Sequence, residues 1–431
     1  MNADELYRLN IAQLTALAKG GKLSPTEIVE SCIARISQRD SEVLAWAAFD
    51  PEFALEQARQ LEESDVRGPL YGTPLGVKDI IDTADFPTAR GSSVFRNRRP
   101  QTDASCVKLL REAGGIIMGK TVTTEFAYFA HGPTKNPHNP MHTPGGSSSG
   151  SAASVADFQV PGALGTQTAG SVIRPASFNG IIGFKPTYGL FPLDGVLPLA
   201  SSLDTLGLFC RSLDDLPILG SVLTHEARFK TRPVVSSPRV AIIKSPQWFK
   251  GSGEMQESFE AFVSRLRESG LVVTDVDSPI LEGLAESQGS LLALEAQETL
   301  GPIVSLNPSK VRKETKDLLE LGRGLKPEIL HEINSQVGRA RIFFQEKVFV
   351  ESDIVLTPAA IGVAPRGLTS TGDPLFNRIW TFLGLPCLSL PIGIGSNGLP
   401  LGIQVVGPFG EDEQLLACSH LLVDNCQFPI V

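Results

Sequence analysis

The chain has 431 residues, of which 42% are hydrophobic and 20% are charged, a composition typical of a globular protein with a sizeable apolar core. Its formal net charge is −9 and it has no basic run, which argues against nucleic acid or an anionic membrane as its main partner. The six cysteines form no CxxC pair and the histidines no HExxH pair, so we expect buried free thiols and neither a bound metal nor another cofactor.

The first part of the chain is predicted to be helical. Leucines spaced along residues 4–20 indicate an amphipathic helix. Ser24-Pro25-Thr26-Glu27 is a capping box with proline at the first helical position, so a second helix is expected to begin there. A third helix is predicted at about 51–64.

A different pattern follows. The segment TPLGVKDIID (73–82) reads as a short apolar strand interrupted by Lys78. Asp103 is expected to cap a helix that ends at the glycine pair 114–115, before a strand at 116–120.

The middle of the chain has two contrasting parts. Residues 131–150 are rich in Pro, Asn, Gly and Ser, which is typical of a loop. Residues 151–210 are rich in Gly, Ala, Ser and Val with little charge, which indicates a buried region with closely packed backbone.

The second half alternates strand and helix patterns. Strands are predicted at 239–244, 271–276, 353–358, 387–393 and 401–407, and helices at about 254–268, through most of 281–350, around 374–383 and from 411. Such alternation predicts an α/β fold with a central mixed sheet flanked by helices on both faces. We expect one domain over 1–431, with a helical layer at about 1–65, a core at about 66–215, a more variable helical part at about 216–350 and the rest of the sheet at about 351–431.

The stretch TPGGSSSGSAAS (143–154) allows several interpretations. A flexible linker is disfavoured because apolar sequence follows, and a phosphate loop because no lysine follows Gly150. A nucleophile elbow, GxSxG with Ser148 at its centre, lacks the strand that must precede it. A serine that works with a lysine remains, although no S-x-x-K motif is present.

Three blocks together resemble the amidase signature family. They are GTPLGVKDIID (72–82), TPGGSSSGSAAS (143–154) and GTQTAGSVIRPAS (165–177), and the two serines they align are 24 residues apart, the usual interval of the family. The resemblance implies the amidase signature fold, with Ser171 as nucleophile, Ser147 as a bridging serine beside a cis peptide and Lys78 as base. It also implies that backbone N–H groups form the oxyanion hole, here at Thr168, Ala169, Gly170 and Ser171.

The chemistry suits these residue types. A serine hydroxyl needs a base, and a lysine is a base only when neutral, so its pKa must fall from about 10.4 by roughly two to three units. Burial among apolar neighbours without a carboxylate partner produces such a shift, and Lys78 lies among leucine, valine and isoleucine. Ser147 can both donate and accept a proton, so it can act as a relay.

The chain departs from the commonest family pattern at two positions. Gln167 replaces a usual aspartate, which removes a charged partner for Arg174, and Ala169 replaces a usual glycine, which restricts φ in the oxyanion loop. Aromatic residues near the motifs are candidates for the wall of a substrate pocket, namely Tyr128, Phe129, Phe191 and Trp380.

These observations lead to a main hypothesis and two alternatives. The first is a free-standing amidase that cleaves a small carboxamide or urea-like C–N bond through an acyl-enzyme. The second is a glutaminase-type subunit of a tRNA-dependent amidotransferase, for which the chain is short and residues 281–350 offer no recognisable glutamine-binding part. The third is a non-catalytic amidase-like subunit.

The partners and location follow from the main hypothesis. We expect a small-molecule amide and water as partners, no nucleic acid and no membrane, and a homodimer is compatible with this hypothesis. No signal-type N-terminus and no apolar run of the ~20 residues that a membrane span needs are present, so a cytoplasmic location is expected.

Overall fold

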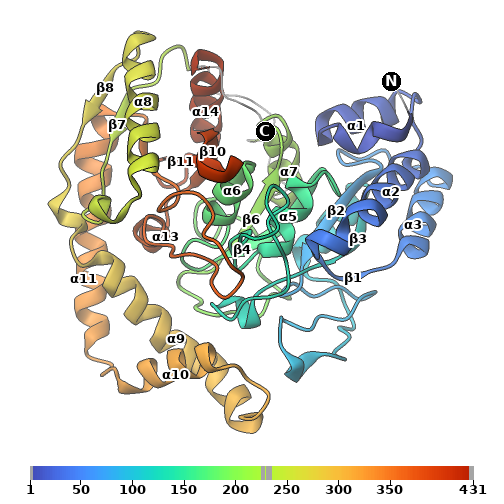
Figure 1. Cartoon of the computed structure of the whole chain (residues 1–431), viewed down its shortest axis with the longest axis horizontal. Coiled ribbons are helices and arrows are strands. Elements are labelled where there is room, and N and C mark those ends of the chain that lie inside the picture. Colours follow the sequence, from blue (N-terminus) through green and yellow to red (C-terminus); the bar gives the residue numbers. More distant parts are fainter. Residues whose placement is uncertain (1–2, 225–228, 230–234, 427–431) are drawn as a thin grey trace.

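An 11-stranded mixed sheet runs through the middle of the computed structural model, which describes residues 3–224, 229 and 235–426 (Figure 1). The strand order is β1-β3-β2-β4-β6-β5-β10-β11-β9-β7-β8. Parallel pairs join β2 to β3 and β4, and β7 to β8 and β9, while the remaining neighbours are antiparallel. The strands are β1 (Trp46–Phe49), β2 (Thr73–Lys78), β3 (Gly115–Thr121), β4 (Gly162–Gln167), β5 (Ile182–Lys185), β6 (Thr205–Cys210), β7 (Val240–Ile242), β8 (Val273–Asp275), β9 (Ile354–Pro358), β10 (Cys387–Ile394) and β11 (Pro400–Val406).

Helices cover both faces of this sheet, which confirms the predicted fold class. The N-terminal and central helices are α1 (Ile11–Lys19), α2 (Pro25–Val43), α3 (Pro51–Glu63), α4 (Ser105–Glu112), α5 (Ser149–Ala156), α6 (Ile173–Asn179) and α7 (Asp215–Thr224). The later helices are α8 (Gly253–Glu268), α9 (Leu284–Leu306), α10 (Lys313–Gly324), α11 (Ile329–Phe343), α12 (Phe349–Glu351), α13 (Arg378–Leu383) and α14 (Asp412–Cys426).

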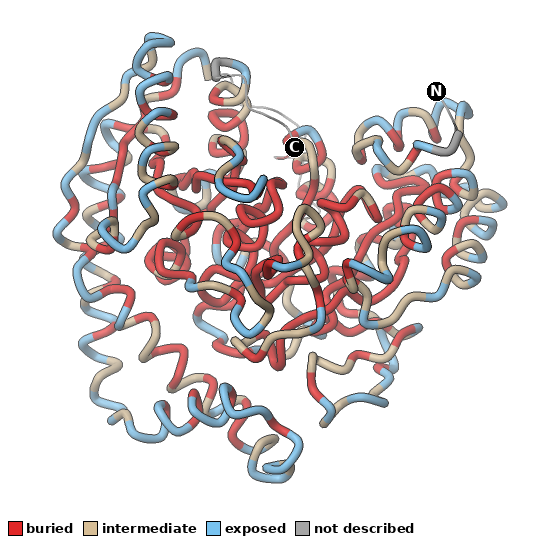
Figure 2. The backbone as a smooth tube through the Cα atoms, in the orientation of Figure 1, coloured by how far each residue is buried: buried red, intermediate tan, exposed pale blue. Residues whose placement is uncertain are grey.

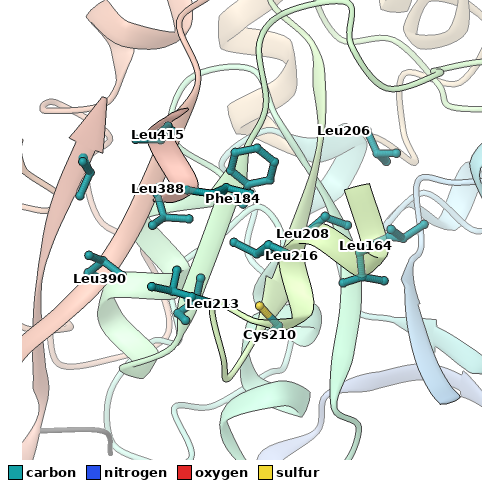
Figure 3. Close-up of a cluster of buried hydrophobic side chains, with 14 of the residues drawn as sticks. Leu164, Phe184, Leu206, Leu208, Cys210, Leu213, Leu216, Leu388, Leu390 and Leu415 are labelled. Carbon is teal, nitrogen blue, oxygen red and sulfur yellow. The ribbon is translucent and has the colours of Figure 1, made fainter. Parts of the chain in front are cut away.

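Side chains of the central strands alternate between two apolar layers. In β4, Ala163 contacts the layer formed with α2, α3, α5 and α6, whereas Leu164 contacts the layer formed with α4, α7, α8 and α14. Phe209 and Leu208 of β6 divide in the same way. Figure 3 shows the second layer, where leucines from the sheet meet leucines of α7 and α14. Because both faces are covered, the residues of β2 to β6, of β9 and of β11 are buried without a break, whichever face they point to.

A group of long helices extends from one end of the sheet. α9 packs against α10 and α13. Pale blue, exposed residues are frequent along this group of helices in Figure 2, whereas the centre of the molecule is mostly buried. These helices come from the part of the chain expected to be variable and helical, and α9 carries residues to the site described below.

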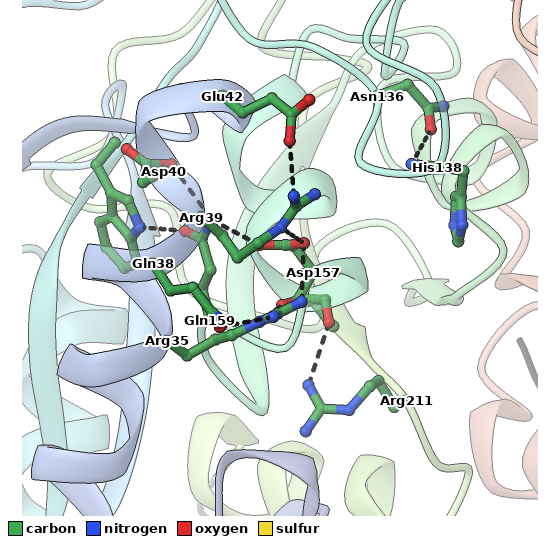
Figure 4. A network of polar contacts seen from close by, with 12 residues as sticks. Arg35, Gln38, Arg39, Asp40, Glu42, Asn136, His138, Asp157, Gln159 and Arg211 are labelled. Carbon is green, nitrogen blue, oxygen red and sulfur yellow. Dashed lines mark hydrogen bonds and ion pairs between the residues drawn. The ribbon is translucent and has the colours of Figure 1, made fainter. Parts of the chain in front are cut away.

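A buried acid joins α2 to α5, the helix that begins within the serine-rich stretch (Figure 4). Asp157, at the end of α5, accepts hydrogen bonds from Arg35 and Arg39 of α2, both at 3.1 Å. The Trp46 indole donates to Gln159 at 2.6 Å. These contacts join the C-terminal end of α5 to the N-terminal part of the chain.

The structure corrects several local predictions. The helix expected over 4–20 is two pieces, because Asn10 caps α1 and a 3₁₀-helix precedes it. Asp103 does not cap α4, since its carboxylate accepts instead from the Ala84 N–H and the Arg111 guanidinium. Strand β1 was not predicted, because four residues with mixed exposure give no clear periodicity.

The cysteine prediction is confirmed for five residues, which are buried and free: Cys32, Cys106, Cys210, Cys387 and Cys418. The side chain of Cys426 lies outside the described residues. Among the helices of the described ranges, none combines the length and the apolar character needed to cross a membrane.

Candidate active site

Strand β2 delivers Lys78 to the centre of the molecule. Every residue of β2 is buried, and its neighbours β3 and β4 run parallel to it, so the last side chain of the strand is fully enclosed. The Lys78 Nζ lies 2.8 Å from the Ser147 Oγ and 2.7 Å from the Thr166 Oγ1. The Thr166 carbonyl oxygen is 3.3 Å away. The ammonium or amine therefore has only neutral oxygens as direct partners among the described residues.

Burial lowers the pKa of Lys78 well below its ordinary value, and the charge of Asp204 acts in the opposite direction. The adjacent Asp79 does not neutralise this lysine, because strand alternation turns it to the other face. There its carboxylate lies 3.4 Å from the Nζ of Lys120. The neutral form of Lys78 is therefore more favourable near pH 7 than the neutral form of an exposed lysine.

The loop before α5 presents Ser147 to Lys78. The Gly146–Ser147 peptide bond is cis, as the resemblance implied. The carbonyl oxygen of Gly146 accepts a hydrogen bond of 2.6 Å from Arg174, whose Nε donates to the Thr371 carbonyl at 2.9 Å. Arg174 is itself buried, which lowers its pKa to about 9. This arginine therefore ties the serine loop to α6 and to the loop at Thr371.

Ser148 does not fit the nucleophile-elbow interpretation. Its side chain is completely buried, and its Oγ lies 3.3 Å from both the carbonyl oxygen and the N–H of Thr166. It contacts no cavity of the described structure that also holds Ser171. The serine that faces the lysine is its neighbour, Ser147.

Ser171 lies in the loop between β4 and α6 and shares a cavity of about 360 Å³ with Ser147. Thr168, Ala169 and Arg174 line the same cavity. The Lys78 amine contacts Ser147 from the interior of the protein, so Ser147 lies between Lys78 and the cavity. Ser171 lies on the wall of the same cavity. Within the described chain, the backbone N–H groups of residues 168–171 donate to no other protein group.

Gln167 caps the helix that follows Ser171. Its Oε1 accepts from the N–H groups of Val172 and Ile173, at 2.8 and 3.0 Å, and its Nε2 donates to the Thr381 Oγ1 at 2.9 Å. An amide can make all three bonds, whereas a carboxylate would lack the donor. The expected loss of a charged partner for Arg174 is offset by the carbonyl groups that Arg174 binds.

The two small residues of the loop have different requirements. Ala169 does not have a positive φ, so the alanine is compatible with this backbone. A Cβ on Gly170 would lie 2.4 Å from the Asn377 Oδ1 and 2.7 Å from the Pro374 Cβ, so only glycine fits there. The restriction of φ that an alanine imposes at position 169 is therefore compatible with the conformation of this loop.

The cavity wall contains two of the four predicted aromatic residues. Tyr128 and Phe129 line it. Phe191 and Trp380 do not, and the prediction is wrong for them: Phe191 packs against Phe184 in the sheet core, and Trp380 is fully buried against Phe344.

Sequence reasoning also missed residues of this wall. Arg378 comes from α13, and the wall formed by α9 and α10 contributes Glu286, Gly289, Ser290, Leu292, Leu318 and Leu321. No motif could have identified the residues of α9 and α10, because they lie more than 100 residues from the nucleophile loop. Arg378 lies in the helix predicted around 374–383, so its charge was an available signal.

The chain belongs to the amidase family, whose profile matches residues 27–416. It is 30% identical to the A-type subunit of glutamyl-tRNA(Gln) amidotransferase from Lachnospira eligens, over 95% of this chain and 96% of that protein. The protein of the same name from Nitratidesulfovibrio vulgaris is 32% identical, over 97% and 96% of the two chains.

Solved structures of amidases superpose on nearly the whole chain. A crystal structure of an amidase superposes with a TM-score of 0.89 at 29% identity and covers 97% of this chain and 100% of its own. Peptide amidase from Stenotrophomonas maltophilia superposes with a TM-score of 0.82 at 25% identity, over 99% and 98% of the two chains.

The names of the relatives contradict the expected set of partners. We expected a small-molecule amide and no nucleic acid, but proteins that match almost the whole chain are named as subunits of an amidotransferase for glutamyl-tRNA(Gln). That expectation is wrong because it relied on the net charge of −9. The net charge of one polypeptide does not report which part of an assembly contacts nucleic acid.

Proposed function

We propose that this chain is a glutaminase-type subunit of a tRNA-dependent amidotransferase, and that it releases ammonia from glutamine through an acyl-enzyme on Ser171. The observation that carries the chemistry is the buried Lys78 amine, 2.8 Å from Ser147 Oγ, at a cavity that Ser171 also lines. The names of relatives that align over nearly the full length support the glutaminase assignment over a free-standing amidase.

In the proposed reaction, neutral Lys78 accepts a proton from Ser147 as Ser147 accepts one from Ser171. The Ser171 Oγ then forms a bond to the carboxamide carbon of the substrate. The C–N bond breaks, and the proton returns along the same path to the leaving nitrogen, so that ammonia departs. Water then attacks the acyl carbon and gives a proton to the Ser147–Lys78 pair. The bond between the acyl carbon and the Ser171 Oγ breaks, Ser171 regains its proton, and glutamate is released.

Backbone N–H groups of residues 168–171 are proposed to bind the oxyanion of each tetrahedral intermediate. They have no protein acceptor within the described chain, and the loop lines the cavity, which supports this role. Each well-placed donor of this type lowers the activation free energy by about 2.7–4 kcal/mol.

The charges of the cavity wall suit an amino acid as substrate. Arg378 and Glu286 both line the cavity, so a free α-carboxylate and α-ammonium would each find an opposite charge. Tyr128 and Phe129 supply apolar surface for the methylene groups. We place the activity in the cytoplasm, where glutamine and charged tRNA are both available.

The test measures ammonia release from glutamine by the chain alone and by the chain with the proteins that co-purify with it, with and without glutamyl-tRNA(Gln). We expect release to increase when both the co-purifying proteins and the tRNA are present, and Ser171→Ala to abolish it. Rapid turnover of simple aliphatic or aryl amides by the chain alone, with no response to partner or tRNA, would contradict the amidotransferase assignment.

A further inference from the structure

Helix α9 reaches the nucleophile loop through one buried side chain. Gln288 is fully enclosed, and its Nε2 donates to the carbonyl oxygen of Thr168 at 2.9 Å. Its Oε1 accepts from the Arg378 Nη1 at 3.2 Å. Both ends of this amide are therefore occupied, one by the proposed oxyanion loop and the other by a residue of the cavity wall.

The contact to Thr168 constrains the peptide group that follows it. The peptide unit is planar and trans, so its N–H points opposite to its carbonyl. When Gln288 holds the Thr168 carbonyl, the N–H of Ala169 must point to the other side of the loop. Ala169 lines the cavity, and its N–H has no acceptor among the described residues.

The next peptide is held in the same manner from another helix. The Thr381 hydroxyl of α13 lies 2.7 Å from the Ala169 carbonyl, closer than the 3.1 Å to the Asn377 carbonyl. Its oxygen also accepts from Gln167. This arrangement leaves the Gly170 N–H directed away from α13. Two successive carbonyls are thus held outward, and two successive N–H groups are left without a partner in the described part of the protein.

We propose that Gln288 is a positioning residue of the oxyanion hole, which sets the direction of the Ala169 N–H by holding the Thr168 carbonyl. This inference rests on the proposed function, because it assumes that Ser171 is the nucleophile. It assigns a role to α9, a helix from the segment in which no family motif was recognisable. It also gives a physical link between Arg378, which lines the substrate cavity, and the group that stabilises the transition state.

Two substitutions distinguish the contributions of the two hydrogen bonds that the Gln288 side chain makes. Gln288→Glu keeps an acceptor for Arg378 and replaces the donor to Thr168 with a negatively charged oxygen. Gln288→Met has a similar length and removes both bonds. Gln297→Met is the matched control, since it makes the same change on α9 away from the cavity.

The experiment measures the rate constant of Ser171 labelling by a fluorophosphonate, together with kcat and KM for glutamine and the inhibition constant of a trifluoromethyl ketone analogue. The labelled end-point reports the fraction of folded protein, so a rate constant remains interpretable even when part of a variant misfolds. If the wild-type chain is not labelled at Ser171, the proposed function fails, and this outcome is distinct from a failure of the Gln288 proposal.

For both Gln288 variants we expect the labelling rate constant and kcat to fall roughly 10- to 100-fold, less than the 10²–10³-fold cost of deleting a donor outright. KM should change little, and the ketone should bind more weakly by a similar factor. Gln297→Met should match the wild type. A Gln288→Glu variant with wild-type rate constants would overturn the proposal, and so would a pure KM effect, which would instead assign Gln288 to substrate binding through Arg378.

Discussion

Replacing Lys78 by methionine should lower the activity by two to four orders of magnitude while leaving the fold intact. Removing a general base typically lowers the rate 10²- to 10⁴-fold, which corresponds to about 2.7–5.5 kcal/mol in the activation free energy. The variant keeps the length of the side chain and removes the Nζ that contacts Ser147 and Thr166. The reduction should appear in kcat/KM and in the rate constant of Ser171 labelling.

Two opposing terms decide the stability of this variant. Because burial lowers the folded-state pKa of Lys78, the unfolded chain binds a proton that the folded chain does not. The lysine therefore reduces stability at neutral pH by about 1.4 kcal/mol for each unit of lowering, and this cost disappears as pH rises through the unfolded value of about 10.4. Methionine removes that cost but leaves the Thr166 hydroxyl without its partner, at about 1–3 kcal/mol. Because the two effects oppose each other, we expect the variant to fold and its free energy of unfolding to stay close to that of the wild type.

The other buried lysine nearby provides the matched control. Lys120 lies on the neighbouring strand, is equally enclosed, and faces Asp79 rather than the cavity. Lys120→Met leaves that carboxylate buried without its cation, so stability should fall by about 3–5 kcal/mol while the folded fraction keeps its labelling rate constant. Urea unfolding and labelling kinetics measure the two effects. Wild-type kcat/KM in Lys78→Met would refute the reasoning for the whole site.

Three further predictions concern single contacts. Gly170→Ala should slow Ser171 labelling at least tenfold, because its Cβ would lie 2.4 Å from Asn377 Oδ1; an unchanged rate would show that the loop can move freely. Asp157→Ala should lower the free energy of unfolding by about 1–3 kcal/mol in urea titrations, since two arginines of α2 lose their shared partner, and should spare the activity of the folded protein. Burial raises the pKa of Asp215 to about 7, so the folded chain binds an extra proton between about pH 4 and 7 and stability falls as pH rises through that window. Asp215→Asn should weaken this fall in Tm between pH 5 and 8, and an unaltered pH profile would contradict the assignment.

Local sequence signals were sufficient to predict much of the fold, and motif resemblance supplied the candidates for the reacting side chains. The capping box at Ser24 starts α2 as predicted, and the apolar run through Lys78 is a fully buried strand. Both features depend on neighbours within a few residues, which a sequence displays directly. The catalytic roles of Ser147 and Ser171 came from motif resemblance and stay predictions for the assays above.

The order of residues was therefore enough to establish the class of fold, the positions of most helices and strands, and the three motif blocks. Folding in three dimensions settled which serine of the stretch meets Lys78, that Gln167 caps α6, that Phe191 and Trp380 belong to the core, and that α9 supplies Gln288. The difference comes from separation along the chain. Periodicity and capping reveal contacts between residues a few positions apart, whereas the Gln288–Thr168 bond joins residues 120 positions apart and exists only once α9 has packed against the sheet.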